Sequence, residues 1–223
     1  MPGFMLRRYG QIDTHAEHLA ILAPSDQPWP VVIFSPGYGA PRAVYTGLVT
    51  RLASRGFVVV DEQCRSVSAE GVWALGDCNG RGAFTHTAWN DHEIVVANLF
   101  DNDPRRIGDR IPCYALFIDP PLARVGATDT EVRASGRPAL AAKMAMQRVG
   151  RAREAGETQG FMKVVVDAAS RRLLGAAILG YNGDEVIHGL LDIMAAGEPV
   201  DRIARTVHIH PTVSELVPTL LQQ

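Results

Sequence analysis

The chain is poor in cysteine, and its three cysteines follow no familiar pattern. They stand at positions 64, 78 and 113 of 223 residues, with spacings that fit neither a zinc site nor a close redox pair. His208 and His210 could share one strand face, but no further cysteine or histidine cluster accompanies them. We therefore expect reduced, buried thiols, no metal site and a cytoplasmic protein.

The chain also lacks a charge excess and a long apolar run. Lys and Arg number 22 against 24 Asp and Glu, which gives a net charge of −2 and no basic stripe for phosphate contacts. No apolar segment approaches the length of about 20 residues that spans a bilayer, and residues 1–8 lack the apolar core of a secretory signal. Nucleic acid and membrane are therefore not expected as partners.

Two glycine motifs are missing. Gly-x-Gly-x-x-Gly, the turn that holds a dinucleotide pyrophosphate at the start of a helix, occurs nowhere in the chain. Gly-x-Ser-x-Gly, the turn that presents the nucleophile of many serine hydrolases, is absent as well. The sequence therefore holds neither a complete dinucleotide site of that kind nor a recognisable hydrolase nucleophile.

The most informative feature that is present lies near the C-terminus, where His210 precedes Glu215 by five residues. A carboxylate bonded to one nitrogen of an imidazole fixes its tautomer and orientation, so this pair can act as an acid/base. The same segment also fits a capping box, Thr212-x-x-Glu215, at the start of a helix. The residues alone favour the cap over catalysis and leave both interpretations open.

A resemblance to a known family bears on that choice. The run His-Pro-Thr-x-x-Glu, together with an apolar strand at 71–77 that ends in Gly-Asp, resembles the class I pyridine nucleotide-disulfide oxidoreductases, near the mercuric reductase and dihydrolipoamide dehydrogenase group. The likeness runs from about residue 61 to residue 223. It implies FAD as cofactor, NAD(P)H as electron donor in the intact enzyme, a homodimer and a role in cell redox homeostasis. His210 would serve a thiol pair at the subunit boundary, and Glu215 would orient it.

The resemblance also assigns residues to the flavin. Gly76 and Asp77 would meet the ribityl hydroxyls, since glycine lets the backbone approach closely and a short carboxylate suits a diol. Ala83, Phe84 and Thr85 stand where a helix, extending to about residue 100, would point its N-terminus at the isoalloxazine ring. His86 replaces the proline of several relatives.

Parts of the family pattern are missing. The pyrophosphate loop, the Cys-x-x-x-x-Cys redox pair and the nicotinamide domain have no counterpart here, so we expect the chain alone to be incomplete for turnover. A non-enzymatic dimerisation module is therefore an alternative. A natural fusion, a truncated gene and a recombinant fit the sequence equally.

The first 60 residues resemble another family. An apolar strand at 31–35, a helix at 44–55 and a strand at 56–60 look like the start of an α/β-hydrolase of the dienelactone hydrolase or lipase type. Gly37 and Tyr38 would occupy its oxyanion-hole positions. A hydrolase-related protein is thus a third, weaker alternative.

The expected architecture is an α/β and α+β composite with three parts. These are a hydrolase-like fragment (1–60), an FAD-binding segment (61–109) and an antiparallel-sheet dimerisation domain (110–223). In the last part the sequence predicts strands at 113–118, 139–149, 161–167 and 172–180, a short segment at 122–126, and helices from Thr128 to Gly136 and from Asn182 to Gly197.

Overall fold

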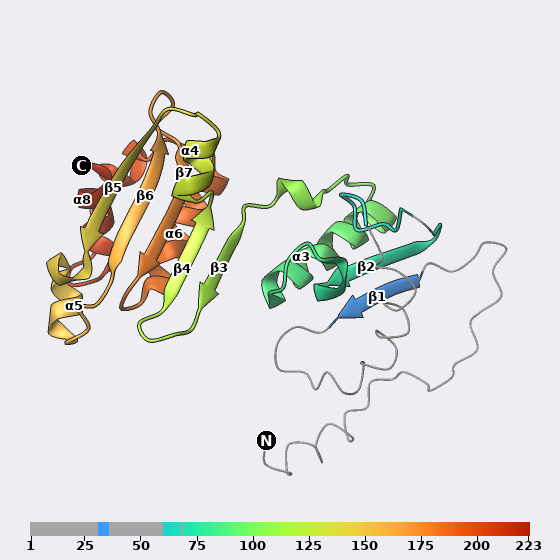
Figure 1. Cartoon of the computed structure of the whole chain (residues 1–223), viewed down its shortest axis with the longest axis horizontal. Helices are drawn as coiled ribbons and strands as arrows, with labels where there is room; N and C mark the ends of the chain where they lie inside the picture. The colour runs from blue at the N-terminus through green and yellow to red at the C-terminus, as the bar shows by residue number, and fades with distance from the viewer. Residues whose placement is uncertain (1–30, 36–59, 68) are drawn as a thin grey trace, which may run out of the picture.

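The computed structural model describes the backbone of residues 31–35 and the whole of residues 60–67 and 69–223. The expected helix at 44–55 and the oxyanion positions Gly37 and Tyr38 lie outside the described residues. Figure 1 shows two bodies, each built on its own sheet, which are joined by the segment around residues 102–112. The mixed α/β composition matches the expected fold class.

The first body contains a small parallel sheet. Strand β1 (Val31–Ser35) pairs with β2 (Val72–Gly76), with Ser35 opposite Gly76. Helix α3 (Thr85–Val96) packs against β2, and Leu75, Ile94 and Val95 are buried between them. The hydrolase-like strand therefore lies directly beside the strand that carries the Gly-Asp motif. Short helical turns complete this body: η1 (Asp77–Asn79), η2 (Ala97–Asp101) and η3 (Ile107–Asp109).

The second body is a five-stranded antiparallel sheet. Its strand order is β3-β4-β7-β6-β5. Helices α6 and α8 lie behind the sheet as it is drawn in Figure 1. The bounds are β3 Cys113–Leu116, β4 Leu122–Gly126, β5 Ala139–Ala145, β6 Phe161–Asp167, β7 Leu173–Leu179, α6 Gly183–Ala195, α7 Asp201–Ala204 and α8 Val217–Leu221.

The strands predicted at 161–167 and 172–180 are confirmed in this body. Strands β6 and β7 pair as neighbours, and β5 lies at the edge of the sheet. Alternate side chains of β6, such as Met162 and Val164, are buried against Leu190 of α6 and Leu220 of α8. One face of each strand therefore supplies the core, as a period of two requires.

The helix ends follow their local signals. Thr128 accepts a hydrogen bond from the Glu131 N–H at 3.0 Å, and Glu131 accepts one in return from the Thr128 N–H, so the predicted capping box is confirmed. The helix it starts, α4 (Asp129–Ala134), is followed by Gly136 at φ +69°. Pro218 stands in the first turn of α8, where proline costs no intrahelical hydrogen bond and introduces no kink.

Two expected strand ends were wrong, and one segment is a strand that was not expected. The strand expected at 113–118 ends at Leu116, and Phe117 and Ile118 are exposed in the turn before β4. The strand expected at 139–149 ends at Ala145 and gives way to a 3-10 turn, η4 (Met146–Arg148), and the short helix α5 (Gly150–Glu154). The segment 122–126, expected only to precede a helix, is strand β4, which lies between β3 and β7 in the sheet. Apolar composition alone does not separate a strand from the turn that follows it.

Candidate functional site

His210 and Glu215 form a direct pair. The His210 Nδ1 atom lies 2.7 Å from Glu215 Oε2. Because a carboxylate only accepts hydrogen bonds, Nδ1 must carry the shared proton, and Nε2 is left for a reactant. The imidazole is 78% exposed whereas the carboxylate is only 15% exposed. The pair thus presents an oriented ring to solvent and keeps its orienting group inside.

The loop around the pair is fixed by its own polar groups. Thr212 Oγ1 accepts a hydrogen bond from the Glu215 N–H at 3.2 Å and donates to the Ile209 carbonyl at 2.6 Å. His208 Nδ1 lies 2.7 Å from the Ser214 carbonyl. The two interpretations of this segment are therefore compatible: the Glu215 backbone takes part in a cap-like turn, and its carboxylate turns to His210 instead of closing the box.

The Gly-Asp motif forms a tight turn at the end of β2. Gly76 has φ +72° and ψ −155°, a conformation that disfavours any side chain. Asp77 follows it, and its Oδ1 atom is buried without a hydrogen-bond partner among the described residues. An unsatisfied buried acceptor needs an explanation, and a ligand hydroxyl would supply one.

Asp91, which the sequence analysis did not single out, accepts hydrogen bonds from this turn. Its side chain is 1% exposed, and its Oδ2 accepts from the Gly76 N–H at 2.9 Å and from Asn79 Nδ2 at 2.8 Å. Arg110 Nη1 lies 2.9 Å from the other oxygen and also donates to the Thr87 carbonyl at 2.9 Å. The network ties the Gly-Asp turn to α3 and to the segment that leads into β3. The sequence signal that could have identified Asp91 is an acidic residue at a position of α3 that is otherwise apolar and buried.

The remaining flavin candidates lie near the junction of the two bodies. Thr85 is the first residue of α3, and Ala83 and Thr85 are both exposed. The Phe84 ring stacks on Tyr114 of β3, with centroids 5.6 Å apart, and His86 Nε2 lies 2.8 Å from the Cys113 carbonyl. Phe84 is therefore engaged with the sheet of the second body. The helix start is anchored rather than isolated.

The three cysteines are free thiols. Cys64 is buried, and burial raises its pKa to about 12. Burial likewise raises the pKa of Cys78 and of Cys113, which are half-buried. Since the thiolate is the reactive form, these side chains are poor nucleophiles at neutral pH.

The described residues contain neither a group of metal ligands nor a membrane-spanning helix. In residues 60–67 and 69–223, no three or more His, Cys, Asp or Glu side chains are grouped so as to hold a metal ion. Nor does that part of the chain contain a helix with the length and hydropathy needed to cross a bilayer.

The described chain thus combines a Gly-Asp turn that leads into a helix with an antiparallel domain that displays a His-Glu pair. Residues 113–221 match the family model described as pyridine nucleotide-disulphide oxidoreductase, dimerisation domain. This part of the chain is therefore similar to the dimerisation domain of the pyridine nucleotide-disulfide oxidoreductases. Residues 4–89 match a second model, platelet-activating factor acetylhydrolase, isoform II, which agrees with the expected hydrolase-like segment.

Similar proteins agree with this family. The probable pyridine nucleotide-disulfide oxidoreductase RclA of Escherichia coli is 30% identical over 210 residues, which cover 92% of this chain and 46% of that protein. Dihydrolipoyl dehydrogenase 2 of Haloarcula marismortui is 36% identical over 162 residues, or 73% of this chain and 34% of that protein. The chain therefore spans less than half the length of these relatives.

Solved structures show the same relationship. The HOCl-induced flavoprotein disulfide reductase RclA from Escherichia coli superposes with a TM-score of 0.71 at 33% identity, over 75% of this chain and 39% of that one. LpdA from Mycobacterium tuberculosis gives a TM-score of 0.69 at 20% identity, which shows a shared fold. The boundaries predicted at residues 60 and 109 stay predictions, since the hydrolase match runs on to residue 89.

The residues present fit FAD, the cofactor of this family, in part. The unpartnered buried oxygen of Asp77 could accept a hydrogen bond from a ribityl hydroxyl. Gly76 has no side chain to keep the cofactor away from the backbone. The first N–H groups of α3, which have no partner within the helix, could face the edge of the ring. A loop for the pyrophosphate is not found in the sequence. These residues could therefore contact only one part of the cofactor.

Proposed function

We propose that residues 61–223 serve as the flavin-contacting segment and dimerisation domain of an FAD-dependent pyridine nucleotide-disulfide oxidoreductase. In the intact protein electrons would pass from NAD(P)H through FAD to a disulfide. The observation that carries this proposal is the 2.7 Å contact between His210 Nδ1 and Glu215 Oε2, which fixes the ring with its other nitrogen free. FAD, when bound, supplies the electron transfer between nicotinamide and disulfide.

The acid/base step falls to His210. With Nδ1–H bonded to Glu215, the lone pair of Nε2 can take a proton from a thiol and return it to a leaving thiolate. Glu215 stabilises the imidazolium that forms in between, because the carboxylate lies within hydrogen-bond distance. Asp91 and Arg110 act through the Gly-Asp turn as positioning residues, since they contact its backbone and neighbours rather than a reactant.

The same geometry supports a homodimer. His210 is largely exposed, and the apolar side chains of Val207 and Ile209 beside it are 95% and 79% exposed. Exposed apolar side chains that flank a polar working group indicate a surface that another chain covers. We propose that His210 serves a thiol pair held by the partner subunit in a cytoplasmic enzyme, and that FAD is held between several segments.

The experiment combines mass and colour. Purified full chain is examined by light scattering and by absorption near about 450 nm, where oxidised flavin absorbs. A yellow dimer supports the proposal, and His210→Gln should keep the dimer. A colourless dimer favours the alternative of a non-enzymatic dimerisation module. A colourless monomer contradicts both.

A hydrolase-related function is a second candidate, favoured by the match of residues 4–89. Ser35, the last residue of β1, ends its strand opposite Gly76, and no nucleophile turn follows in the sequence. Turnover of a nitrophenyl ester by the full chain, lost in Ser35→Ala, would establish a hydrolytic site. Turnover that is absent, or that survives this change, speaks against Ser35 as its nucleophile.

A further inference from the structure

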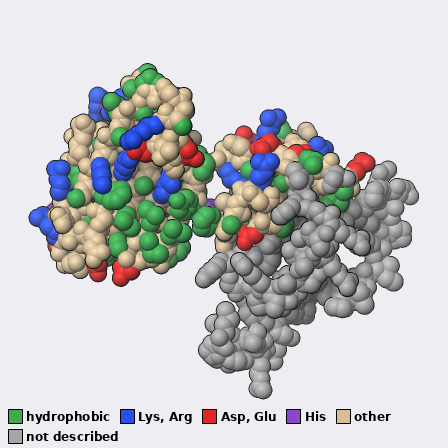
Figure 2. Space-filling model, viewed as in Figure 1, with side chains coloured by type: hydrophobic (Ala, Val, Ile, Leu, Met, Phe, Trp, Pro, Cys, Tyr) green, Lys and Arg blue, Asp and Glu red, His purple; other side chains and the backbone are tan. Residues whose placement is uncertain are grey.

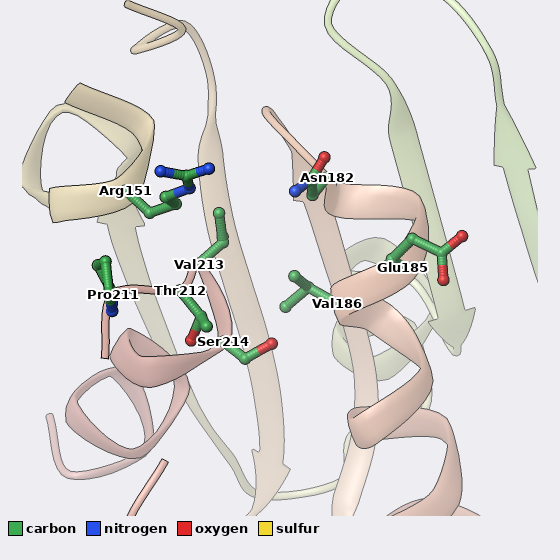
Figure 3. Close-up of a pocket in the computed structure, with 8 residues that line it drawn as sticks. All are labelled: Arg151, Asn182, Glu185, Val186, Pro211, Thr212, Val213 and Ser214. Carbon is green, nitrogen blue, oxygen red and sulfur yellow. The ribbon is translucent and has the colours of Figure 1, made fainter. Parts of the chain in front are cut away.

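A pocket lies directly beside the His210–Glu215 pair. It has a volume of about 570 Å³, within the range of roughly 300–1,000 Å³ typical of small-molecule sites. Three segments form its walls: α5, the first turn of α6, and the loop of residues 211–214 that joins the two members of the pair. Figure 3 shows these walls, with Arg151, Val213 and Asn182 around the central space.

The pocket wall adjoins the acid/base pair along the chain. Pro211 directly follows His210, and Ser214 directly precedes Glu215, so both ends of the pair border the pocket wall. At the start of α5, a side chain on Gly150 would come within 3.6 Å of Glu215 Oε1. A ligand held in the pocket would therefore lie beside the segment that carries the imidazole.

The chemistry of the walls favours an anion with a small apolar body. Arg151 extends from α5 over Val213 toward Asn182, while Glu185 points away from this space (Figure 3). Val186 and Val213 supply apolar surface, and Arg151 supplies a guanidinium with five N–H donors. Arg148 and Arg153 lie on the same segment, where they outnumber Glu154.

The guanidinium is not committed to its protein partner. Arg151 Nη1 lies 3.2 Å from Glu154 Oε2, and both side chains are about half exposed. Exposed pairs of this kind contribute little, because water solvates and screens both charges. A carboxylate inside the pocket could compete for Arg151 and make a bidentate contact that Glu154 does not make.

We propose that this pocket is a binding site for the acidic end of a small disulfide, with Arg151 as the residue that selects for the negative charge. The identity of the ligand as a disulfide rests on the proposed function of the His210–Glu215 pair. Selection of an anionic ligand rests on the pocket itself. The site lies entirely within the second body, so it exists whether or not flavin is bound.

The test uses two probes that differ only in charge. The isotope-labelled full chain is titrated with 3,3′-dithiodipropionate and, separately, with its neutral diamide, and the amide resonances are followed by NMR. The diacid should shift residues 212–214 and the Asn182 side-chain amide, and it should bind at least about tenfold more tightly than the diamide, because the carboxylate adds a charge-assisted contact. Equal affinities, or no shift with either probe, would overturn the proposal.

Matched variants assign the selectivity to one residue. Arg151→Met should abolish the preference for the diacid, whereas Arg153→Met removes a charge from the same helix outside the pocket and should keep it. An equal loss in both variants would show a general charge effect and would refute the assignment of Arg151.

His210→Gln separates the pocket from the proposed function. His210 is not part of the pocket wall, so this variant should bind the diacid normally. Normal binding of the diacid by a chain that is a colourless monomer would contradict the proposed function and leave the pocket. Equal affinities for the two probes in a chain that forms a yellow dimer would contradict the proposed pocket and leave the proposed function.

Discussion

Asp91 and Arg110 form an ion pair at the base of the Gly-Asp turn, with 2.9 Å between Nη1 and Oδ1. Asp91 is almost fully buried, and Arg110 is 16% exposed. The pair joins helix α3 to the segment that leads into the second body, and the same carboxylate bonds the Gly76 N–H. The geometry of the Gly-Asp turn therefore depends on a contact made from outside β2.

Removing the cation from this pair should destabilise the first body. In Arg110→Met the Asp91 carboxylate stays buried without its charge partner, and breaking a buried pair in this way costs about 3–5 kcal/mol. The measurement is urea unfolding followed by the fluorescence of Trp73 and Trp89, which lie in that body.

The control for this change is Arg105→Met. Arg105 pairs with Asp103 at the surface, so its loss should leave the transition almost unchanged. If Arg110→Met unfolded at the same urea concentration as this control, the buried pair would not be supporting the turn.

Removing the carboxylate of the acid/base pair should release the imidazole. In the neutral ring, the bond to Glu215 favours the proton on Nδ1. Glu215→Ala should shift the neutral ring toward the Nε2–H tautomer that histidine favours in water. The nitrogen chemical shifts of the His210 ring, measured above about pH 8 where a free imidazole is neutral, report this change.

His208 supplies the comparison within the same spectra. Its Nδ1 contacts the Ser214 carbonyl rather than a carboxylate, so its tautomer should not change in Glu215→Ala. In an intact enzyme that includes the redox pair and the nicotinamide domain, His210→Gln should slow disulfide reduction by about 10²–10⁴-fold, the usual contribution of general acid/base catalysis. His208→Gln should have a much smaller effect. Equal effects of the two substitutions would argue against an acid/base role for His210.

Local signals in the sequence were sufficient for most of the second body. The hairpin of β6 and β7, the capping box at Thr128 and the helix that begins after Asn182 each depend on residues a few positions apart. Such patterns are visible in a single sequence because neighbouring residues fix them. The same holds for the His210–Glu215 pair, which spans five residues.

Contacts between distant segments could not be found in this way. The parallel pairing of β1 with β2 and the bond from Gly76 to Asp91, fifteen residues later, depend on how the chain closes in space. The pocket next to His210 is likewise made by α5, α6 and a loop that are separate in sequence. Arg151 lies in a run of charged residues with no distinguishing motif, and its position beside the pair is a property of the fold.

The second body should lose stability when a buried side chain of α6 is shortened. Leu190 is 1% exposed and packs against the sheet, so Leu190→Ala should lower the free energy of unfolding by about 2–5 kcal/mol through lost burial and a residual cavity. Leu140 lies on β5 and is half exposed, so Leu140→Ala should cost much less. Thermal unfolding of both variants checks the difference. Similar losses would mean that α6 does not pack on the sheet as observed.

Stability in acid should depend on Asp167, at the end of β6. The Ser170 N–H and hydroxyl both donate to its Oδ1 at 2.7 Å, and Arg137 contacts Oδ2. These bonds, the backbone bond foremost, hold the pKa of Asp167 well below its usual range. A lowered folded-state pKa contributes stability above the unfolded value, about 3.9, and that contribution is lost as the pH falls toward the folded value.

Asp167→Asn should therefore lower stability at pH 7 and flatten its decline below about pH 4, so that the two stability curves converge in acid. Ser170→Ala removes one donor to the same oxygen and should give an intermediate curve. Urea unfolding of the three proteins between about pH 2.5 and pH 7 gives the differences directly. Curves that stay parallel over this range would show that the Asp167 carboxylate titrates alike in the folded and unfolded chain, against the bonding seen at the hairpin.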